Sequence, residues 1–414
     1  MSATDPSEGQ VPAEIAFLRS PEAVRERSEA LFEFVRLGQS RHFALELGRL
    51  DATSELTWRV LTEAYPDPRT VPSHSRVNHF RVGGTDRLAA IETALPDARE
   101  RARALTDLIV TSVLLDAGAG SDWSYLEPGS GLRLGRSEGL ALASWHAFAG
   151  GLFSSDPRQP WQADAAGLAS VSTERLAAAF QVRPDNPLVG VEERAALLRR
   201  LGAVLSSHAS AFARQGRVGG LCDAWLAEAS DGRLPAARVL GRVLEALGPI
   251  WPARTQCLGI ELGDVWFHRG AGGTGPARGL VPFHKLSQWL SYSLLYPLAV
   301  AGLEVVRVDA LTGLAEYRNG GLFFDAGVIV PKHPGVTSDL HAASSELVVE
   351  WRALTVALLD RLAAALRQRA GLDAASLPLG KILEGGSWAA GRRLAAERRA
   401  GAPPIRVQSD GTLF

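Results

Sequence analysis

Residues 347–371, LVVEWRALTVALLDRLAAALRQRAG, decide the fold class of this 414-residue chain. Large apolar side chains recur in this stretch every three or four positions, which places them along one face of an α-helix. These side chains are Leu347, Trp351, Leu354, Leu358, Leu362 and Leu366. Gly371 supplies a stop, because glycine commonly follows the last turn of a helix. The pattern therefore predicts a long helix with one face against a hydrophobic core.

The same periodicity occurs upstream, in residues 192–212, where leucines and valines fall at helical spacings among arginines. Strand-like runs are short by comparison. They are residues 303–308, 322–330 and 405–414, the last with a Ser-Asp-Gly turn. Because these runs are too few for a large sheet, we expect small hairpins beside helices and a mainly α fold.

The domain organisation follows from composition along the chain. Residues 1–12 are polar and rich in Ser, Pro and Gly, so we expect a disordered tail there. Residues 13–414 show no repeat of fixed period and no long low-complexity linker, and the glycine-rich residues 270–279 predict one loop. The prediction is a single compact helical unit over residues 13–414, with small β elements.

Overall composition excludes several classes of function. Hydrophobic residues make up 46% and charged residues 21% of the chain, which is typical of folded globular proteins. The 44 Lys and Arg residues balance 45 Asp and Glu residues, so no global field attracts nucleic acid or an anionic membrane. Any phosphate must be bound locally, by a few positioned cations or backbone N–H groups.

The cysteines and the first residues indicate the cellular setting. Cys222 and Cys257 offer no CxxC spacing for zinc or redox chemistry, and we expect both to be buried thiols. The start, MSATDPSEGQVPAE, lacks the features of a secretory signal, and no run of about 18 apolar residues follows. These observations predict a cytoplasmic protein without a membrane partner.

Residues 65–87, YPDPRTVPSHSRVNHFRVGGTDR, form the first of four segments with unusual polar residues. His74 and His79 could suggest a metal, yet a five-residue spacing across a proline-broken segment fixes no ligand geometry. A hydrogen-bonded structural loop is the favoured interpretation. Anion binding by Arg76 or Arg87, with the backbone of the Gly-Gly pair, is a weaker alternative.

Residues 116–140, DAGAGSDWSYLEPGSGLRLGRSEGL, form the second segment. Small residues permit close approach of a ligand, and Asp122, Trp123, Tyr125 and Glu127 combine carboxylates with aromatic faces. A pocket wall and an ordinary core with Asp122 as a cap are equally supported. No βαβ unit surrounds the GxGxxG-like spacing, so a dinucleotide site is excluded.

Residues 281–297, VPFHKLSQWLSYSLLYP, predict a helix that starts at Pro282 and ends before Pro297. One face of this helix is apolar and another is polar. The polar residues are His284, Gln288 and Ser291, with Lys285 beside them. A polar face is usually solvated, but this one lacks acidic partners and is flanked by aromatic residues, which favours a pocket.

Residues 311–330, LTGLAEYRNGGLFFDAGVIV, place four polar residues directly before a Gly pair and between apolar runs. These residues are Glu316, Tyr317, Arg318 and Asn319. Apolar anchors and a flexible Gly-Gly pair can present a carboxylate into a cavity, where Arg318 can bind it or an anionic ligand. The alternative from spacing alone is a Glu–Arg turn on the surface.

Several phrases of the sequence resemble the uracil catabolism protein 4 family, from Tyr65 essentially to the C-terminus. They are YPDP, DAGAG.DWSY, RSEGLALAS, FSSDP, LGDVWFH, LVPFHKLSQWLSYSL and LTGLAEYRNGGLFFD. This resemblance implies a pathway that converts uracil into urea and a three-carbon acid. In its implied order, uracil is ribosylated, a cyclohydrolase-like pathway partner opens the ring, and urea is released.

A more distant resemblance links the chain to the queuosine salvage proteins, which hydrolyse a nucleotide N-glycosidic bond on a helical fold akin to DNA glycosylases. Their FYKRAQ helix is similar to Phe283, His284, Lys285 and Gln288. Their catalytic ADYR turn is similar to Ala315, Glu316, Tyr317 and Arg318, with Glu in place of Asp. Their glycine-rich helix and Thr-Asp-Pro turn are similar to residues 139–149 followed by Ser155, Asp156 and Pro157. The implied fold is a compact, glycosylase-like helical fold, and the His-for-Tyr and Glu-for-Asp changes imply a substrate other than queuosine.

Together these resemblances lead to a hypothesis of N-glycosidic bond hydrolysis, which releases urea from ribosylurea or its 5′-phosphate. Glu316 is the expected catalytic carboxylate, because an oxocarbenium-like transition state needs a nearby negative charge. Asp122 is a candidate proton donor to urea. The expected substrate-binding residues are His284, Lys285, Gln288, Arg318, Trp123, Tyr317, Arg136 and Asn319.

Two other classes of function remain open. One is an amidohydrolase acting on a ring-opened uracil nucleotide, which needs a metal or an activated nucleophile. The other is a non-catalytic protein that binds the pathway intermediate. No cofactor and no metal are expected, so activity should survive chelation.

Overall fold

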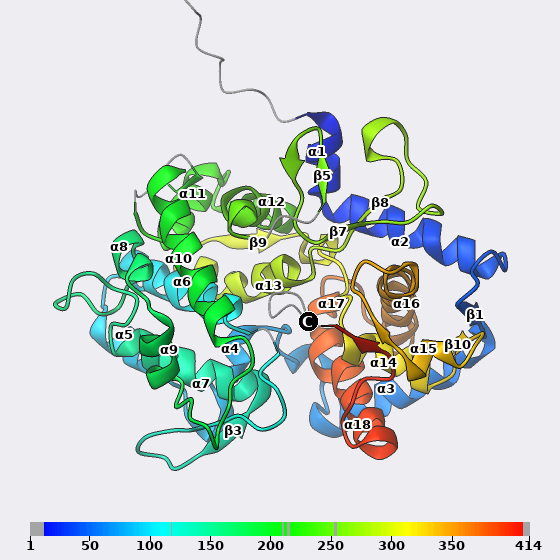
Figure 1. Ribbon diagram of the computed structural model, residues 1–414, viewed down its shortest axis with the longest axis horizontal. Helices are drawn as coiled ribbons and strands as arrows, with labels where there is room; N and C mark the ends of the chain where they lie inside the picture. Colours follow the sequence, from blue (N-terminus) through cyan, green and yellow to red (C-terminus); the bar gives the residue numbers. More distant parts are fainter. Residues whose placement is uncertain (1–11, 117, 209–210, 213–215, 252–254, 409–414) are drawn as a thin grey trace, which may run out of the picture.

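The computed structural model describes residues 12–116, 118–208, 211–212, 216–251 and 255–408 (Figure 1). Its longer helices are α2 (Pro21–Arg36), α3 (Leu50–Ala64), α6 (Ala98–Leu114), α7 (Arg136–Ala149), α10 (Val191–Ser207), α11 (Gly220–Glu228), α12 (Ala236–Leu247), α13 (Lys285–Val300), α14 (Tyr317–Asp325), α16 (Glu346–Ala370) and α18 (Trp388–Arg399). Shorter ones are α1 (Ala13–Leu18), α4 (Arg76–His79), α5 (Ala89–Ala94), α8 (Ala165–Ala169), α9 (Thr173–Ala179), α15 (Gly335–Ser338) and α17 (Leu379–Ile382). The tail predicted for residues 1–12 lies outside the described residues, except for Pro12.

The helices predicted from periodicity are present. The predicted C-terminal helix is α16, which begins after the N-cap Ser345 and ends at Gly371, a glycine with a φ of 63° in the left-handed region. Helix α10 matches the periodicity of residues 192–212 but ends at Ser207, so Phe212 lies beyond it. The prediction of a mainly α fold with small β elements is confirmed.

All sheets among the described residues have two strands. The antiparallel pairs are β1 (Phe43–Leu45) with β10 (Ile329–Pro331), β2 (Ser124–Leu126) with β3 (Arg133–Gly135), β5 (Gln256–Cys257) with β6 (Ile260–Glu261) and β7 (Val265–Phe267) with β8 (Leu280–Pro282). The parallel pairs are β4 (Arg233–Pro235) with β9 (Glu304–Val306) and β11 (Leu340–His341) with β12 (Arg406–Val407). Residues 303–308 contain β9, which pairs with the distant β4 instead of forming the expected hairpin. Residues 405–408 contain β12, while the Ser-Asp-Gly turn expected at residues 409–411 lies outside the described residues.

Two predicted boundaries were wrong. The first half of the strand expected over residues 322–330 is helical, because Glu316 caps α14 and starts a helix there. Helix α13 begins at Lys285 after strand β8, and it contains Pro297 instead of ending before it. Proline removes one backbone donor near the end of this helix, but Leu298 remains fully buried, so packing outweighs that loss.

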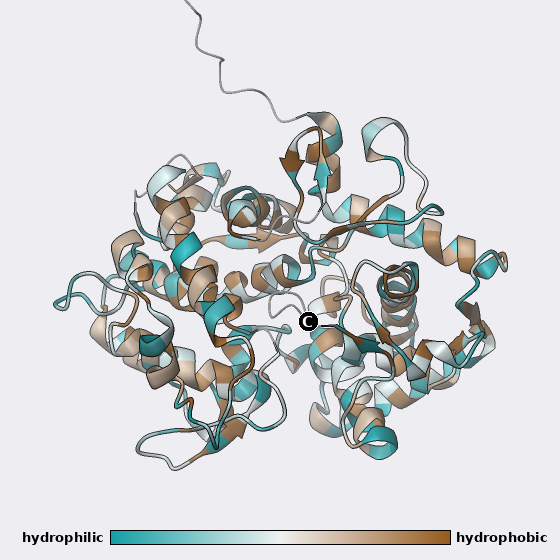
Figure 2. Cartoon of the chain, viewed as in Figure 1, coloured by the Kyte–Doolittle hydropathy of each residue, from teal (hydrophilic) through white to brown (hydrophobic). Residues whose placement is uncertain are grey.

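The helices surround one large hydrophobic cluster that includes residues from Phe32 to Ile405. Figure 1 shows α5 to α12 on one side, α3 and α14 to α18 on the other, and α13 between them. Helix α13 packs on α4, α6 and α12. Figure 2 shows hydrophilic and hydrophobic residues interspersed along the helices, as amphipathic packing requires.

Two further expectations concern the cysteines and membranes. Cys222 and Cys257 are both free and buried, as predicted. None of the helices in the described part of the chain combines the length and apolar character needed to span a bilayer.

Candidate functional site

The first residue of α13, Lys285, is fixed by a buried ion pair. Its backbone N–H donates to the carboxylate of Asp264 at 3.0 Å, and Arg352 holds that carboxylate through two hydrogen bonds of 2.7 and 2.8 Å. Burial alone would raise the pKa of Asp264. The charge of Arg352 and the hydrogen bonds to the carboxylate have a larger, opposite effect, so the net pKa lies well below its usual range. The start of α13 is therefore held by a permanently ionised carboxylate.

The residue before Lys285 has a structural role. His284 lies in the left-handed region with a φ of 47°, and its Nε2 donates to the carbonyl of Leu18 at 2.8 Å. His284 is only 2% exposed. Its ring bonds to Leu18, the last residue of α1, where a substrate contact had been expected. A non-glycine residue in this region is costly, and such positions occur frequently near functional sites.

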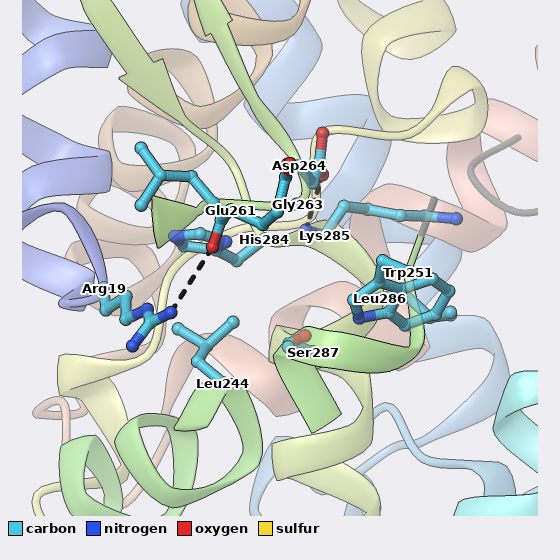
Figure 3. Close-up of a pocket in the computed structure, with 12 residues that line it drawn as sticks. Arg19, Leu244, Trp251, Glu261, Gly263, Asp264, His284, Lys285, Leu286 and Ser287 are labelled. Carbon is cyan, nitrogen blue, oxygen red and sulfur yellow. Dashed lines mark hydrogen bonds between the residues drawn. The ribbon is translucent and has the colours of Figure 1, made fainter. Parts of the chain in front are cut away.

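The ammonium of Lys285 has no hydrogen bond or ion pair with a described residue. Figure 3 shows its side chain extending away from Arg19 and Glu261. Burial lowers its pKa, and the nearby charges of Glu316 and Asp116 oppose this shift. Lys285 is thus a half-buried cation near two carboxylates that it does not contact. Its ammonium is free to bind a ligand.

Glu316 is the N-cap of α14. Its carboxylate accepts the backbone N–H groups of Arg318 at 2.7 Å and Asn319 at 2.6 Å. Burial raises the pKa of Glu316, while these two bonds and the charges of Lys285 and His74 lower it, and the net shift is upward. A carboxylate of this kind is rigid and has a pKa closer to neutrality, as general bases require.

Two amide side chains hold the turn before α14. The Asn319 amide donates to the carbonyl of Leu314 at 3.3 Å and accepts the hydroxyl of Ser387 at 2.8 Å. The Gln288 carbonyl accepts the backbone N–H of Thr312 at 3.3 Å, and its buried Nε2 has no partner in the described structure. Both residues are fully buried, so they position the turn that carries Glu316.

The Gly pair after Asn319 serves packing rather than flexibility, contrary to expectation. Both glycines are buried within α14. A Cβ on Gly320 would lie 2.8 Å from the Trp351 indole nitrogen, and one on Gly321 would lie 3.4 Å from Pro404. The glycines therefore let the capped helix lie close to α16 and to the C-terminal segment.

Three residues from the predicted site gather beside Glu316. The Arg318 guanidinium lies 4.8 Å from the centre of the Tyr317 ring and donates to the carbonyl of Gly401 at 3.3 Å. Burial raises the pKa of Tyr317, and the charges of Arg318 and Arg136 oppose that shift. Arg136, the first residue of α7, has a φ of 54° and also approaches Gly401. Helices α7 and α14 therefore bring two guanidinium groups to one place.

His74, in the segment interpreted as a structural loop, also lies near Glu316. His74 Nδ1 lies 2.5 Å from Oε2 of Glu384, and the His74 backbone N–H donates to the carbonyl of Gly380. Glu384 lies in η8 (Leu383–Ser387), a π-helical turn between α17 and α18. Such turns occur frequently at functional sites, because they reorient side chains within a helix.

A second histidine, His79, lies near the same tryptophan as His74. The centres of the His74 and His79 rings are 6.1 and 6.0 Å from that of Trp289. His79 Nδ1 accepts a hydrogen bond from Arg76 at 3.2 Å, and Arg76 is paired with Asp116 at 2.7 Å. Burial and the Arg76 charge lower the pKa of His79 to about 4, so this ring is neutral at physiological pH.

Asp122 and Trp123 do not join this group. Asp122 is exposed, and among described residues its side chain bonds only to Ser121. The Trp123 indole is 2% exposed, donates to the carbonyl of Phe180 at 2.9 Å and stacks on the Phe180 ring. Trp123 is therefore an ordinary core residue, which was one of the two interpretations of this segment. Asp122 lies on the surface.

The structure thus collects Glu316, Lys285, Tyr317, Arg318 and Arg136 at one site, with Gln288, Asn319 and His284 as their supports. Sequence reasoning did not select the residues that complete it. They are His74, His79, Asp116, Trp289 and Glu384. The sequence held one indication of Glu384, because this carboxylate directly precedes a Gly pair, as Asn319 does.

A small cavity lies at the start of α13, and Lys285 is among the residues that line it (Figure 3). It is lined by Arg19, Trp251, Glu261, Asp264 and His284, among others, and has a volume of about 30 Å³. This volume suits a water molecule or two and not a nucleoside.

One cluster among the described residues has the ligand types for a metal. His268, Glu346 and Glu350 bring their ligand atoms within 4.8 Å of one another. However, His268 Nδ1 accepts the backbone N–H of Gly270 at 3.0 Å, so the neutral ring carries its proton on Nε2, 3.1 Å from Glu350. A metal would need the lone pair of that nitrogen. Arg41 and Arg269 also bind Glu346, so the donor set fits a hydrogen-bonded ion network better than a metal.

Comparison with known proteins covers nearly the whole chain. A family model described as "Protein of unknown function (DUF1688)" matches residues 17–414. "Protein urg3" of Schizosaccharomyces pombe is 38% identical over 410 residues, which cover 97% of this chain and 99% of that protein. "Uracil catabolism protein 4" of Lachancea kluyveri is 36% identical over 436 residues, with the same coverage of 97% and 99%.

Proposed function

The chain belongs to the DUF1688 family, with uracil catabolism protein 4 as a relative, and from this premise we propose that it is an N-glycosyl hydrolase of uracil catabolism. Its substrate is ribosylurea or ribosylurea 5′-phosphate, and its products are urea and the sugar. The observation that carries this proposal is the carboxylate of Glu316, which is rigidly capped and faces the unpaired ammonium of Lys285.

Glu316 supplies the negative charge that the reaction needs. Cleavage of a C1′–N bond builds positive charge on the sugar ring, and a carboxylate beside C1′ stabilises that charge or accepts a proton from the attacking water. Two backbone N–H groups prevent the carboxylate from rotating away. A group that is already oriented needs little reorganisation during the reaction, which is the main source of electrostatic catalysis.

The cations beside Glu316 bind the substrate. Lys285 is available for the ribose hydroxyls or a phosphate, since it has no partner among described residues. Arg136 and Arg318 both lie near Gly401 and offer planar donors to an anion. Tyr317 lies next to both, so its ring covers one side of the site.

Incubation of the purified protein with ribosylurea and with its 5′-phosphate tests this proposal. Equal amounts of urea and of ribose or ribose phosphate are expected, with a preference for one of the two substrates. Release of ammonia with an intact C1′–N bond would support an amidohydrolase instead. Binding without any product would support the non-catalytic alternative.

A further inference from the structure

Urea leaves poorly as an anion, so an N-glycosyl hydrolase that releases it needs a proton donor. Asp122 is exposed and remote from the residues around Glu316. The described residues offer two histidines at the site, His74 and His79, both in contact with Trp289. Their hydrogen bonds differ, and this difference decides which one can serve as an acid.

His79 is a poor candidate. Its Nδ1 accepts a hydrogen bond from Arg76, a permanent cation, which disfavours a second positive charge on the ring. Arg76 itself is fully buried and cannot turn away, because it also bonds to Ser112 and Asp116. His79 is therefore restricted to its neutral form.

His74 has the opposite surroundings. Its Nδ1 donates to the carboxylate of Glu384 at 2.5 Å, and this charge-assisted hydrogen bond orients the ring. Burial alone would raise the pKa of Glu384. The hydrogen bond and the charge of His74 have a larger, opposite effect, so the net pKa is lowered and Glu384 stays ionised. The ring is held between Trp289 and Trp388, with 9% of the side chain exposed. Its Nε2 has no partner among the described residues.

We infer that the His74–Glu384 pair is the general acid of this site, with Nε2 of His74 donating the proton to urea. This inference rests on the proposed function. In the reaction, the Nε2 proton moves to the urea nitrogen bonded to C1′, and the C1′–N bond breaks with its electron pair going to that nitrogen. Water adds to C1′ and loses a proton to Glu316. That proton returns to His74, so one water is consumed for each urea and sugar formed.

The position of His74 relative to Glu316 fits this division of roles. The charge of His74 is close enough to lower the pKa of Glu316. Glu316 caps α14 and His74 lies in the loop before α4, so two separate segments supply the proposed base and acid. The titratable or charged groups around the pair are Glu316, His79, Tyr65 and, across Trp388, Arg392, and the neutral amide of Asn78 bonds to Glu384.

The test compares two leaving groups in the full-length protein. Nitrophenolate leaves as a stable anion and needs no proton, whereas urea does. With His74→Gln, we expect a loss of about 100-fold or more for ribosylurea and a loss below about tenfold for nitrophenyl riboside. His208→Gln, an exposed change directly after α10, is the matched control and should alter neither rate.

Glu384→Gln is a second test of the inference, because it preserves the shape of the hydrogen-bonded pair but removes the negative charge of the carboxylate. It should also impair urea release more than nitrophenol release, even if His74→Gln does not fold. Equal losses on both substrates, or full urea release by a folded variant, would overturn the inference while leaving the hydrolase function intact. If the wild type releases no urea from either form of ribosylurea, the proposed function fails, and this inference fails with it.

Discussion

The carboxylate of Glu316 accepts the backbone N–H of Asn319 at 2.6 Å, so the residue proposed for catalysis also caps the helix that follows it. Stability and activity therefore both depend on this side chain. The two contributions can be separated, because a cap needs only a hydrogen-bond acceptor whereas catalysis needs a charge.

Glu316→Ser retains a preferred capping residue but removes the charge. We expect urea release to fall by about 100- to 1000-fold, while the melting temperature changes little. Glu316→Asp keeps both the cap and the charge, with one methylene less reach, and should retain more activity than Ser. Glu316→Ala removes both and should also cost about 1 kcal/mol of folding free energy. Kinetics and thermal unfolding of the three variants together provide the check.

Glu316→Gln tests charge at constant size. Gln retains one acceptor oxygen, so one of the two capping bonds with Arg318 and Asn319 can persist. Urea release should collapse while substrate affinity changes little. Near-normal urea release by the folded Gln variant would place the catalytic carboxylate elsewhere.

Lys285→Met should shift the pH dependence of the reaction. The Lys285 charge lowers the pKa of Glu316, so its removal raises that pKa. Because Glu316 must be ionised to act, the acidic limb of the kcat/KM profile should move to higher pH. The wild-type and variant profiles measure this shift directly. An unchanged acidic limb would show that Lys285 does not act on the catalytic carboxylate.

Lys285→Ala should distinguish the two substrates. Loss of an unpaired cation should raise KM for the 5′-phosphate more than for ribosylurea, with a smaller effect on kcat. Arg183→Ala, which removes an exposed partner of Asp185, is a charge-matched control for general electrostatic effects. Equal KM changes with both substrates would argue against a phosphate contact of Lys285.

The sequence predicted the helices better than the site. Periodic leucines locate α16, since burial of one face dictates their spacing. Around Glu316 the apolar anchors were recognised, but the Gly pair was interpreted as flexible because its close neighbour Trp351 comes from α16, 31 residues later than Gly320 by sequence number. His74 and Glu384 are 310 residues apart, so no local pattern could pair them. The sequence could indicate which residues are unusual, and only the fold could bring them together.

The ion pair between Arg87 and Glu127 predicts a stability effect away from the site. Its two bonds measure 2.5 and 2.6 Å, and both side chains are nearly buried. Glu127→Ala leaves Arg87 buried without its carboxylate, so about 3–5 kcal/mol of folding free energy should be lost. Glu63→Ala, which removes an exposed pair with Arg393, should change the free energy of unfolding little. Chemical denaturation of both variants checks the contrast.

The same pair predicts a dependence on pH. The Arg87 hydrogen bond is the main cause that lowers the pKa of Glu127 to about 2. A carboxylate with a lowered folded-state pKa stabilises the fold above its unfolded pKa of about 4.3. That contribution is lost as the pH falls through about 2. The stability difference between wild type and Glu127→Gln should therefore shrink between about pH 5 and pH 2, as measured by unfolding at each pH.

Chelation separates the hydrolase from a metal-dependent amidohydrolase. His268 presents a protonated Nε2 to Glu350, so the His268–Glu346–Glu350 cluster fits hydrogen bonding better than a metal. Urea release should persist after treatment with EDTA and removal of the chelator. Loss of activity that zinc restores would support the amidohydrolase instead.

The most direct test follows the C1′ carbon of ribosylurea by ¹³C NMR, with wild type and Glu316→Ser at equal concentration. The account predicts that the wild type converts the C1′–N signal into those of the sugar hemiacetal, while the carbonyl carbon appears as urea. The Ser variant should leave the C1′–N signal almost unchanged on the same timescale. An intact C1′–N signal in the wild type, or equal conversion by the two proteins, would contradict the claim that Glu316 drives hydrolysis of the glycosidic bond.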